Sequence, residues 1–337
     1  MKLPGELVDE ILTRVPVKYL LRCRCVSKEW CCLIDSTEFV ENYLKMCVER
    51  NRGGVIVRDY DLAVSSHKYF LVDVESLDNG GEVIVDISEE VKEISDGAML
   101  IDSVNGLVCL SNFENISSIF LLNPCTRKYK KLPVVGKEFL DDNNLSGFAT
   151  VGFGYDDVSD DYKVVMTALC NKPARGIMAI VYSLKKNSWT LIAEVFSTEK
   201  IKFIGCGKFA DGLLRYKAFD VTGLDFFIDF DLGLEKFTEP RYWNNKTMQL
   251  EDISIGKSQY EEMLANPVFK SFRCPKLLMN SKDLSKILLE IFEPSRGRRF
   301  VWHDFRRMTF EIVTIPGISN AFNSERYIES LFPLIEL

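Results

Sequence analysis

The sequence predicts an α+β protein of two domains, a short helical domain over residues 1–48 and an all-β domain over residues 49–337. Three observations lead to this division. Apolar residues up to about residue 48 recur at helical spacing. Gly53 and Gly54 then interrupt the helical pattern. From there onward, short β-rich runs alternate with turn residues, as in antiparallel sheets.

The helical region divides into four short helices. The first is marked by an apolar stripe of Leu7, Val8, Ile11, Leu12 and Val15. Pro16 ends this helix and can open the next one. Ser27 and Ser36 are expected N-caps of the third and fourth helices. Because about fifty residues of short helix bury little apolar surface, stripes on several faces imply that a partner protein covers one of them. A helical cap on the β domain is the alternative.

The clearest β-rich stretch runs from AMLIDS through Asn105-Gly106 and LVCLS to SIFLLN, PCTR and KYKKLP. It predicts four antiparallel strands. Asn-Gly between two apolar runs is a strong hairpin signal, because both residues tolerate the positive φ of a type I′ turn. The stretch therefore predicts a four-stranded unit.

This unit recurs along the chain. In each copy a turn-forming polar residue precedes an aromatic residue by six positions: Asn123 and Tyr129, Ser183 and Trp189, Asp231 and Phe237, Asp304 and Phe310. The polar side chain can bind a turn N–H, and the aromatic residue restarts the next strand. Repeats at roughly 50 to 70 residues predict a β-propeller of about six blades, one or more of them degenerate. A β-sandwich with similar hairpins is the alternative.

Charge and hydropathy exclude several classes of protein. The formal net charge is −7, which does not favour binding to nucleic acid or to an anionic membrane surface. No apolar run approaches the ~18 to 20 residues that cross a bilayer. Glu6, Asp9 and Glu10 lie where an export signal needs apolar residues. We therefore expect a protein of the cytoplasm and/or nucleus that is not secreted and binds neither nucleic acid nor membrane.

The residue patterns of metal and catalytic sites are missing. Four cysteines lie within RCRCVSKEWCCLID, but their spacing does not match a zinc site, so packing as small hydrophobes is favoured over metal binding or regulatory oxidation. His67 and His303 are the only histidines, and no nucleophile elbow accompanies them. We expect no cofactor, no metal and no catalytic residue.

Residues 3–34, LPGELVDEILTRVPVKYLLRCRCVSKEWCCLI, closely resemble the F-box of plant F-box proteins. The resemblance implies docking to a Skp-family adaptor, and through it indirectly to cullin and RING subunits. The adaptor contacts it implies are Leu3, Pro4, Leu7, Ile11, Leu12, Pro16, Leu20, Leu21, Val26, Trp30 and Leu33. Trp30 is expected to be either core or an anchor in the adaptor, and the helical and β domains are expected to have separate cores.

The rest of the chain is similar to the associated domain of the defence-regulating and S-locus F-box branches. The similarity rests on NGLVCL, NPCTRKYKKLP, VGFGYDDVSDDYKVV and IPGISNAFNSERYIESLFPL, and it thins between about residues 240 and 275. It implies a non-catalytic substrate-recognition subunit of an SCF-type ubiquitin ligase, which recruits a target protein for proteasomal degradation. Candidate substrate contacts are the arginines Arg298, Arg299, Arg306 and Arg307.

A second hypothesis from another class is a carbohydrate- or small-ligand-binding propeller without a ligase role. Trp189, Trp243 and Trp302 would then stack on sugar rings, although aromatic residues at strand positions are more often core.

Overall fold

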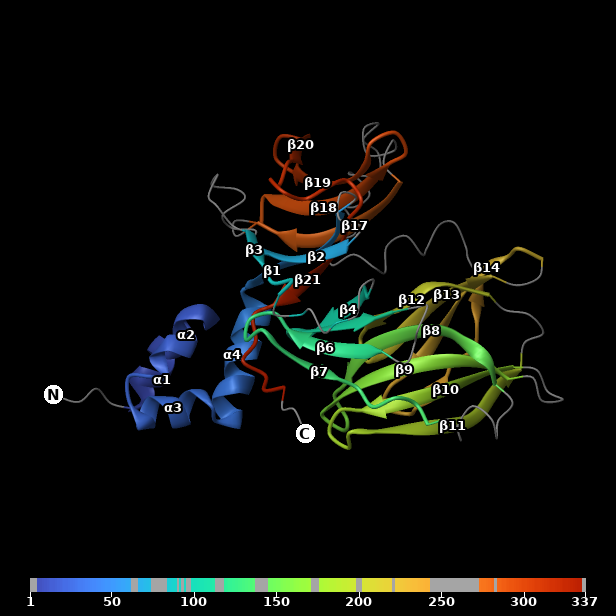
Figure 1. Ribbon diagram of the computed structural model, residues 1–337, viewed down its shortest axis with the longest axis horizontal. Coiled ribbons are helices and arrows are strands. Elements are labelled where there is room, and N and C mark those ends of the chain that lie inside the picture. Colours follow the sequence, from blue (N-terminus) through green and yellow to red (C-terminus); the bar gives the residue numbers. More distant parts are fainter. Residues whose placement is uncertain are drawn as a thin grey trace.

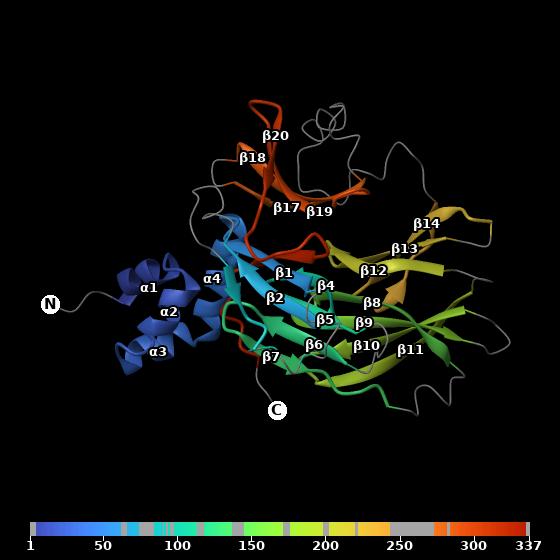
Figure 2. The ribbon, with the colours of Figure 1, turned by 45° about the horizontal axis from the view of Figure 1, so that its top comes forward.

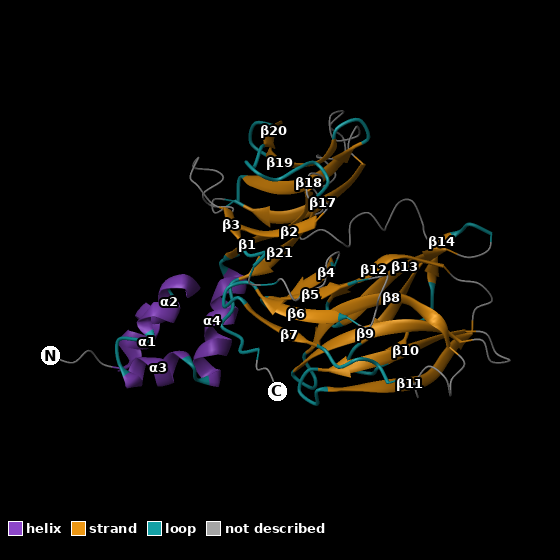
Figure 3. Cartoon of the chain, viewed as in Figure 1, coloured by secondary structure: helices purple, strands orange, loops and turns teal. Residues whose placement is uncertain are grey.

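The computed structural model describes residues 5–61, 66–73, 84–89, 91, 94, 98–112, 118–136, 145–170, 176–197, 202–219, 222–242, 273–281 and 284–334. The four helices of the described residues lie at one end of a β domain (Figures 1 and 3). A view turned by 45° shows the same separation (Figure 2). The order of elements is therefore the one that the sequence predicts, helices first and strands after.

The four helices are α1 (Gly5–Thr13), α2 (Val17–Cys23), α3 (Lys28–Ile34) and α4 (Thr37–Glu49). Both predicted N-caps are present. The Ser27 hydroxyl oxygen accepts a hydrogen bond from the Trp30 N–H at 3.1 Å, and that of Ser36 accepts one from the Phe39 N–H at 3.2 Å. Each cap satisfies one of the N–H groups that the first turn of a helix leaves without a partner.

The described strands form three sheets of four strands and one of nine. The first sheet contains β21 (Asn323–Ile328), β1 (Gly53–Asp61), β2 (Ser66–Val72) and β3 (Ile84–Asp86). The second contains β4 (Met99–Val104), β5 (Leu107–Ser111), β6 (Ile119–Asn123) and β7 (Lys128–Lys131). The last contains β17 (Arg273–Asn280), β18 (Lys286–Glu293), β19 (Gly297–Asp304) and β20 (Thr309–Val313).

The nine-stranded sheet consists of two units. One is β8 (Leu145–Asp156), β9 (Asp161–Cys170), β10 (Gly176–Ser183) and β11 (Ser188–Ser197). The other is β12 (Lys202–Ala210), β13 (Leu213–Phe219), β14 (Asp225–Asp231) and β15 (Lys236–Phe237), with β16 (Arg241–Tyr242) also on β14. A single parallel pair, Gly207 with Gly152, joins them. The described residues thus contain five four-stranded units, and residues 243–272, within the interval left for a degenerate blade, lie outside the described part.

Successive units pack face to face. Ile56 and Phe120 share a core between the first and second sheets, and Leu121 and Phe153 share one between the second and third. Val165 of the third unit and Leu214 of the fourth unit share another core. Val57 of the first sheet and Phe300 of the last sheet share a further one. This serial packing of separate sheets is that of blades, and it differs from the two facing sheets of the sandwich alternative.

The turns confirm the predicted repeat. Asn105 and Gly106 have φ of 47° and 83°, as a type I′ turn requires. In three copies a carboxylate or amide oxygen accepts a turn N–H: Asn123 from Cys125 at 3.0 Å, Asp231 from Leu234 at 2.8 Å, and Asp304 from Arg306 at 2.8 Å. In the fourth, the Ser183 hydroxyl oxygen accepts from the Lys186 N–H at 3.0 Å.

Four charged residues from four different sheets meet on the innermost strands. Glu325 on β21 binds Lys208 on β12 at 2.8 Å and Lys276 on β17 at 2.6 Å. Asp102 on β4 lies 3.7 Å from Lys208 and accepts the Phe209 N–H at 2.9 Å. Burial raises the pKa of Asp102. Burial alone would also raise the pKa of Glu325, but the two ammonium groups outweigh it and lower that pKa.

The lowered pKa of Glu325 leads to a prediction for the variant Glu325→Gln. The carboxylate should contribute stability above about pH 4.3, the ordinary glutamate value, and lose it as the pH falls through the lower folded pKa. We expect the substitution to reduce the free energy of unfolding by about 1–3 kcal/mol at pH 7, below the cost for fully buried pairs because Lys208 still reaches solvent. The difference from the unsubstituted chain should shrink towards pH 3, as measured by urea denaturation.

The control is Asp225→Asn, which removes the exposed Lys217–Asp225 pair and should cost no more than about 0.5 kcal/mol. Two results would contradict the conclusion that the charged cluster stabilises the packing of the blades. One is an equal loss of stability in the two variants, and the other is a loss in Glu325→Gln that does not depend on pH.

Candidate functional site

The helical domain and the β domain share one core. Leu12, Leu20, Ile34, Phe39 and Tyr43 are buried between the helices. The same apolar cluster includes Ile328 and Leu331, at and just after the end of β21. The expectation of separate cores is therefore wrong, because α4 runs directly into β1 and so lies against the strand that pairs with β1.

A polar joint accompanies this shared core. The Tyr43 hydroxyl oxygen lies 2.8 Å from Glu329 Oε2 and 3.0 Å from the Val15 carbonyl oxygen, so its single proton is shared between these two acceptors. The Arg52 guanidinium lies 3.5 Å from the same carboxylate, and the Arg52 carbonyl oxygen accepts the Glu329 N–H at 2.9 Å. Burial, and then the neighbouring Glu329 carboxylate, raise the pKa of Tyr43 well above its usual range. The phenol therefore stays protonated and remains a donor.

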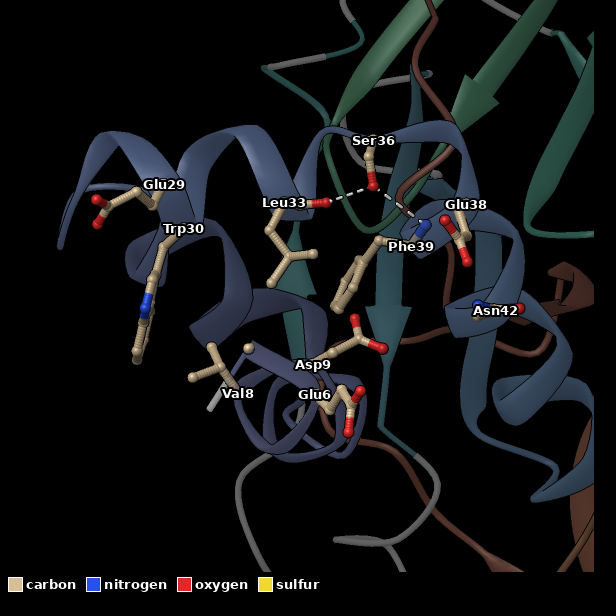
Figure 4. A pocket seen from close by; sticks show the side chains of 11 residues that line it. Glu6, Val8, Asp9, Glu29, Trp30, Leu33, Ser36, Glu38, Phe39 and Asn42 are labelled. Carbon is tan, nitrogen blue, oxygen red and sulfur yellow. Dashed lines mark hydrogen bonds between the residues drawn. The ribbon is translucent and has the colours of Figure 1, made fainter. Parts of the chain in front are cut away.

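An open groove of about 840 Å³ lies on the helical domain, away from this joint. Its apolar lining consists of Val8 on α1, Trp30 and Leu33 on α3, and Phe39 on α4 (Figure 4). Four carboxylates also line it, Glu6, Asp9, Glu29 and Glu38, and its described lining contains no lysine or arginine. A hydrogen bond of 2.7 Å from the Ser36 hydroxyl to the Leu33 carbonyl oxygen, together with the Ser36 cap, fixes the corner between α3 and α4.

The predicted adaptor contacts separate into three groups. Leu7, Ile11 and Val26 are exposed, at 46%, 53% and 65% of their surface. Partly buried side chains are Pro16, Leu21, Trp30 and Leu33. For both of these groups, contact with an adaptor stays a prediction. Leu3 and Pro4 lie outside the described residues.

Leu12 and Leu20 form the third group and require a correction. They are 1% and 0% exposed, so they cannot touch an adaptor directly. An amphipathic stripe identifies apolar side chains that must be shielded from water. It does not show whether the domain's own helices or a partner protein shields them. Val8 and Phe39 were not among the predicted contacts and line the groove. Both belong to apolar helical stripes, which was the only signal for them.

The cysteine-rich segment lies at the end of α2, in the turn that follows it and on α3. Cys25 and Cys32 are exposed, Cys23 and Cys31 are partly buried, and all four are free thiols. Within the described residues, no group of three or more His, Cys, Asp or Glu side chains could hold a metal ion.

The predicted arginine cluster is not one patch. Arg298 and Arg299 lie at the start of β19, whereas Arg306 and Arg307 lie in the turn after its end. An eight-residue strand separates the two pairs by roughly 20 Å or more. Arg298 is also already ion-paired with buried Glu290. The four side chains therefore do not form one compact patch, and their contact with a substrate stays a prediction.

Of the tryptophans in the carbohydrate hypothesis, the two that the structure describes do not form an open stacking platform. Trp302 is 4% exposed and lies in the core between the first and last sheets. Trp189 packs on Tyr182, and its indole N–H donates to the Pro133 carbonyl oxygen at 2.6 Å. Trp243 lies outside the described residues.

Both histidines contact other side chains of the β domain. His67 Nε2 lies 2.9 Å from the Arg58 guanidinium, and buried His303 stacks on Phe310 with ring centroids 4.4 Å apart. Burial lowers the pKa of His303. In the described part of the chain, no helix is long and apolar enough to cross a membrane.

A small helical binding module fixed to one end of a bladed β domain is the class of protein that this fold and this groove define. The family model of the F-box domain matches residues 1–42, and that of the F-box associated beta propeller domain matches residues 60–255. The chain belongs to the F-box proteins that carry an F-box associated beta propeller domain.

Relatives in Arabidopsis thaliana agree over most of the chain. F-box protein CPR1 is 27% identical, over 98% of this chain and 88% of that protein. F-box protein At4g22390 is 26% identical, over 97% and 89%. F-box/kelch-repeat protein At3g23880 is 29% identical, over 70% and 64%. The resemblance and the fold class expected from the sequence are therefore confirmed.

The joint between the two domains makes a prediction for Tyr43→Phe. The substitution keeps the ring in the shared core but removes the donor to Glu329. Because hydrogen bonds to charged groups contribute about 1.5–3 kcal/mol, we expect the free energy of unfolding to fall by about 2 kcal/mol in urea denaturation. Tyr19→Phe, at an exposed position of α2, is the matched control and should change it by less than about 0.5 kcal/mol. Equal stability of the two variants would show that the joint is not stabilising.

Proposed function

We propose that this protein is the substrate-recognition subunit of an SCF-type ubiquitin ligase, in the cytoplasm or nucleus. The helical domain docks on a Skp-family adaptor, which connects it to cullin and RING subunits. The β domain recruits a target protein for ubiquitination and degradation. The protein itself performs no catalytic step, since in such a complex the ubiquitin-conjugating enzyme supplies the chemistry.

The exposed apolar surface of the helical domain carries this proposal. This domain already buries its own core, yet it exposes Leu7 and Ile11 one turn apart on α1, and Val26 after α2. The neighbouring groove adds Trp30 and Leu33, which are only partly covered. Apolar surface left open on so small a domain is typical of a protein–protein interface.

The position of the helices favours substrate recruitment at the opposite end of the blades. Strand β1 begins, and β21 ends, beside α4. The turns at Asn105, Asp160 and Lys185 face α4 at this same end. At the other end of the second sheet, β5 ends at Ser111 and β6 begins at Ile119, and these two residues are paired. Connections of this kind are where rigid scaffolds place recognition residues.

The proposal makes a prediction for Trp30→Ala and for the double variant Leu7→Ala/Ile11→Ala. A buried interface tryptophan costs about 2 kcal/mol or more on truncation, so Trp30→Ala should weaken binding to a purified plant Skp-family adaptor about thirtyfold. The double variant should weaken it to a similar extent. Both can be measured by isothermal titration calorimetry with the full chain.

Val134→Ala, at an exposed position of the β domain, is the control and should leave adaptor affinity within twofold. Point variants are preferable to deletion of residues 1–48, because deletion would uncover Ile328 and Leu331 of the shared core. Unchanged adaptor affinity in both test variants, each still folded, would rule out this docking surface.

A further inference from the structure

A second cavity, of about 460 Å³, lies between the helical domain and the β domain. We call it the junction cavity. It is distinct from the groove in Figure 4, with which it shares no lining residue. One side is formed by Thr37, Val40, Glu41 and Leu44 of α4. The other sides come from the turns of the second and third blades and from the segment 330–334 that follows β21.

The wall on the β side is aromatic and already held in place. Tyr162 is 3% exposed, and its hydroxyl donates to the Asn105 carbonyl oxygen at 3.1 Å. Its ring packs edge-on against Tyr155 and Phe332, with centroids 5.0 and 4.9 Å away. Leu184 and Leu334 extend this apolar wall. A ligand would therefore meet a preformed surface, which lowers the entropic cost of binding.

The charges at the cavity are unequal. Four carboxylates line it, Asp35, Glu41, Asp160 and Asp161, against the two ammonium groups of Lys130 and Lys185. The carboxylates of the turns are satisfied by neighbours, since Lys185 Nζ binds Asp160 at 2.6 Å and the Lys185 N–H binds Asp161 at 2.9 Å. Asp35 is paired with Arg24 at 2.7 Å.

Glu41 differs from the other three carboxylates. It lies on the exposed side of α4, beside Val40 and one turn before Leu44, and forms no ion pair with any residue that the structure describes. The cavity therefore combines an aromatic and aliphatic wall with one carboxylate that is available to a cation. Its volume falls in the usual ~300–1,000 Å³ range of small-molecule sites, which often lie between domains.

We propose that the junction cavity binds a small, mainly aromatic molecule that carries a single ammonium group. The ring system packs on the partly exposed side chains of Tyr155, Leu184 and Phe332, and the ammonium group pairs with Glu41. Because these contacts come from both domains, an occupied cavity adds to the attachment of α4 to the blades. The site is separate from the adaptor surface, and its ligand binding does not depend on the proposed ligase function.

Three naphthalene probes that differ in charge test this site: 2-(1-naphthyl)ethylamine, 2-(1-naphthyl)ethanol and 1-naphthylacetate. Calorimetric titration of the full chain should rank the amine about fivefold tighter than the alcohol, as a partly exposed ion pair of about 1 kcal/mol allows, and the carboxylate weakest. In Glu41→Gln the amine should lose its advantage and bind within twofold of the alcohol. In Leu44→Trp, which fills the cavity, the amine should bind at least tenfold more weakly.

Leu234→Trp, at an exposed turn far along the chain from the cavity residues, is the matched control and should leave probe affinity unchanged. Leu184→Trp fills the cavity from the β side and replaces Leu44→Trp if that variant does not fold. Amine binding that survives both filling variants, or equal affinity for all three probes, would overturn the proposal. Adaptor affinity should stay within twofold in Glu41→Gln, which separates this result from a failure of the docking surface.

Discussion

The hydrogen-bonded pairing of β21 with β1 is the interaction on which the rest of the structure depends. It joins residues from opposite ends of the chain, from Gly53 opposite Ile328 to Arg58 opposite Asn323. The close approach also explains Gly53: a Cβ at this position would lie 1.9 Å from the Tyr327 carbonyl oxygen. The glycine pair that the sequence suggests as a helix breaker is thus also required for this contact.

Residues in and just after β21 contact both the helical domain and two other sheets. Glu325 reaches the charged cluster on the innermost strands, where it meets Lys208 and Lys276 of other blades. Ile328 and Leu331 belong to the core of the helical domain, and Glu329 accepts the Tyr43 hydroxyl. Closure of the first blade and attachment of the helices therefore depend on one strand. For a protein that would hold an adaptor at one end and a target at the other, such attachment keeps the two binding surfaces at a defined distance and angle.

Local features were predictable from the sequence and long-range ones were not. The caps at Ser27 and Ser36 and the turn residues at Asn123, Asp231 and Asp304 act within three residues of themselves, so their sequence signal is complete. The joint between Tyr43 and Glu329 spans a separation of 286 residues, and nothing local indicates it. For the same reason the periodicity of α1 and α2 could identify Leu12 and Leu20 as apolar contacts but could not assign them to the domain's own core.

The separation of the two arginine pairs has a different physical reason. Arg299 and Arg306 are near in sequence, but an extended strand carries the chain about 3.3 Å per residue, so few intervening residues produce a large distance. Close spacing predicts a shared surface only within a helix or a tight turn. The junction cavity was equally inaccessible to sequence reasoning, because its walls come from α4, two blades and the segment after β21.

The claim that the two domains form one cooperative unit through β21 is tested most directly by native-state hydrogen exchange in increasing urea. The amides of α4 and of β21 should exchange with the same opening free energy and the same dependence on urea, because neither element keeps its core without the other. Exchange of the α4 amides at a much lower free energy, while those of β21 remain protected, would show that the helices are an independent domain and would contradict this account.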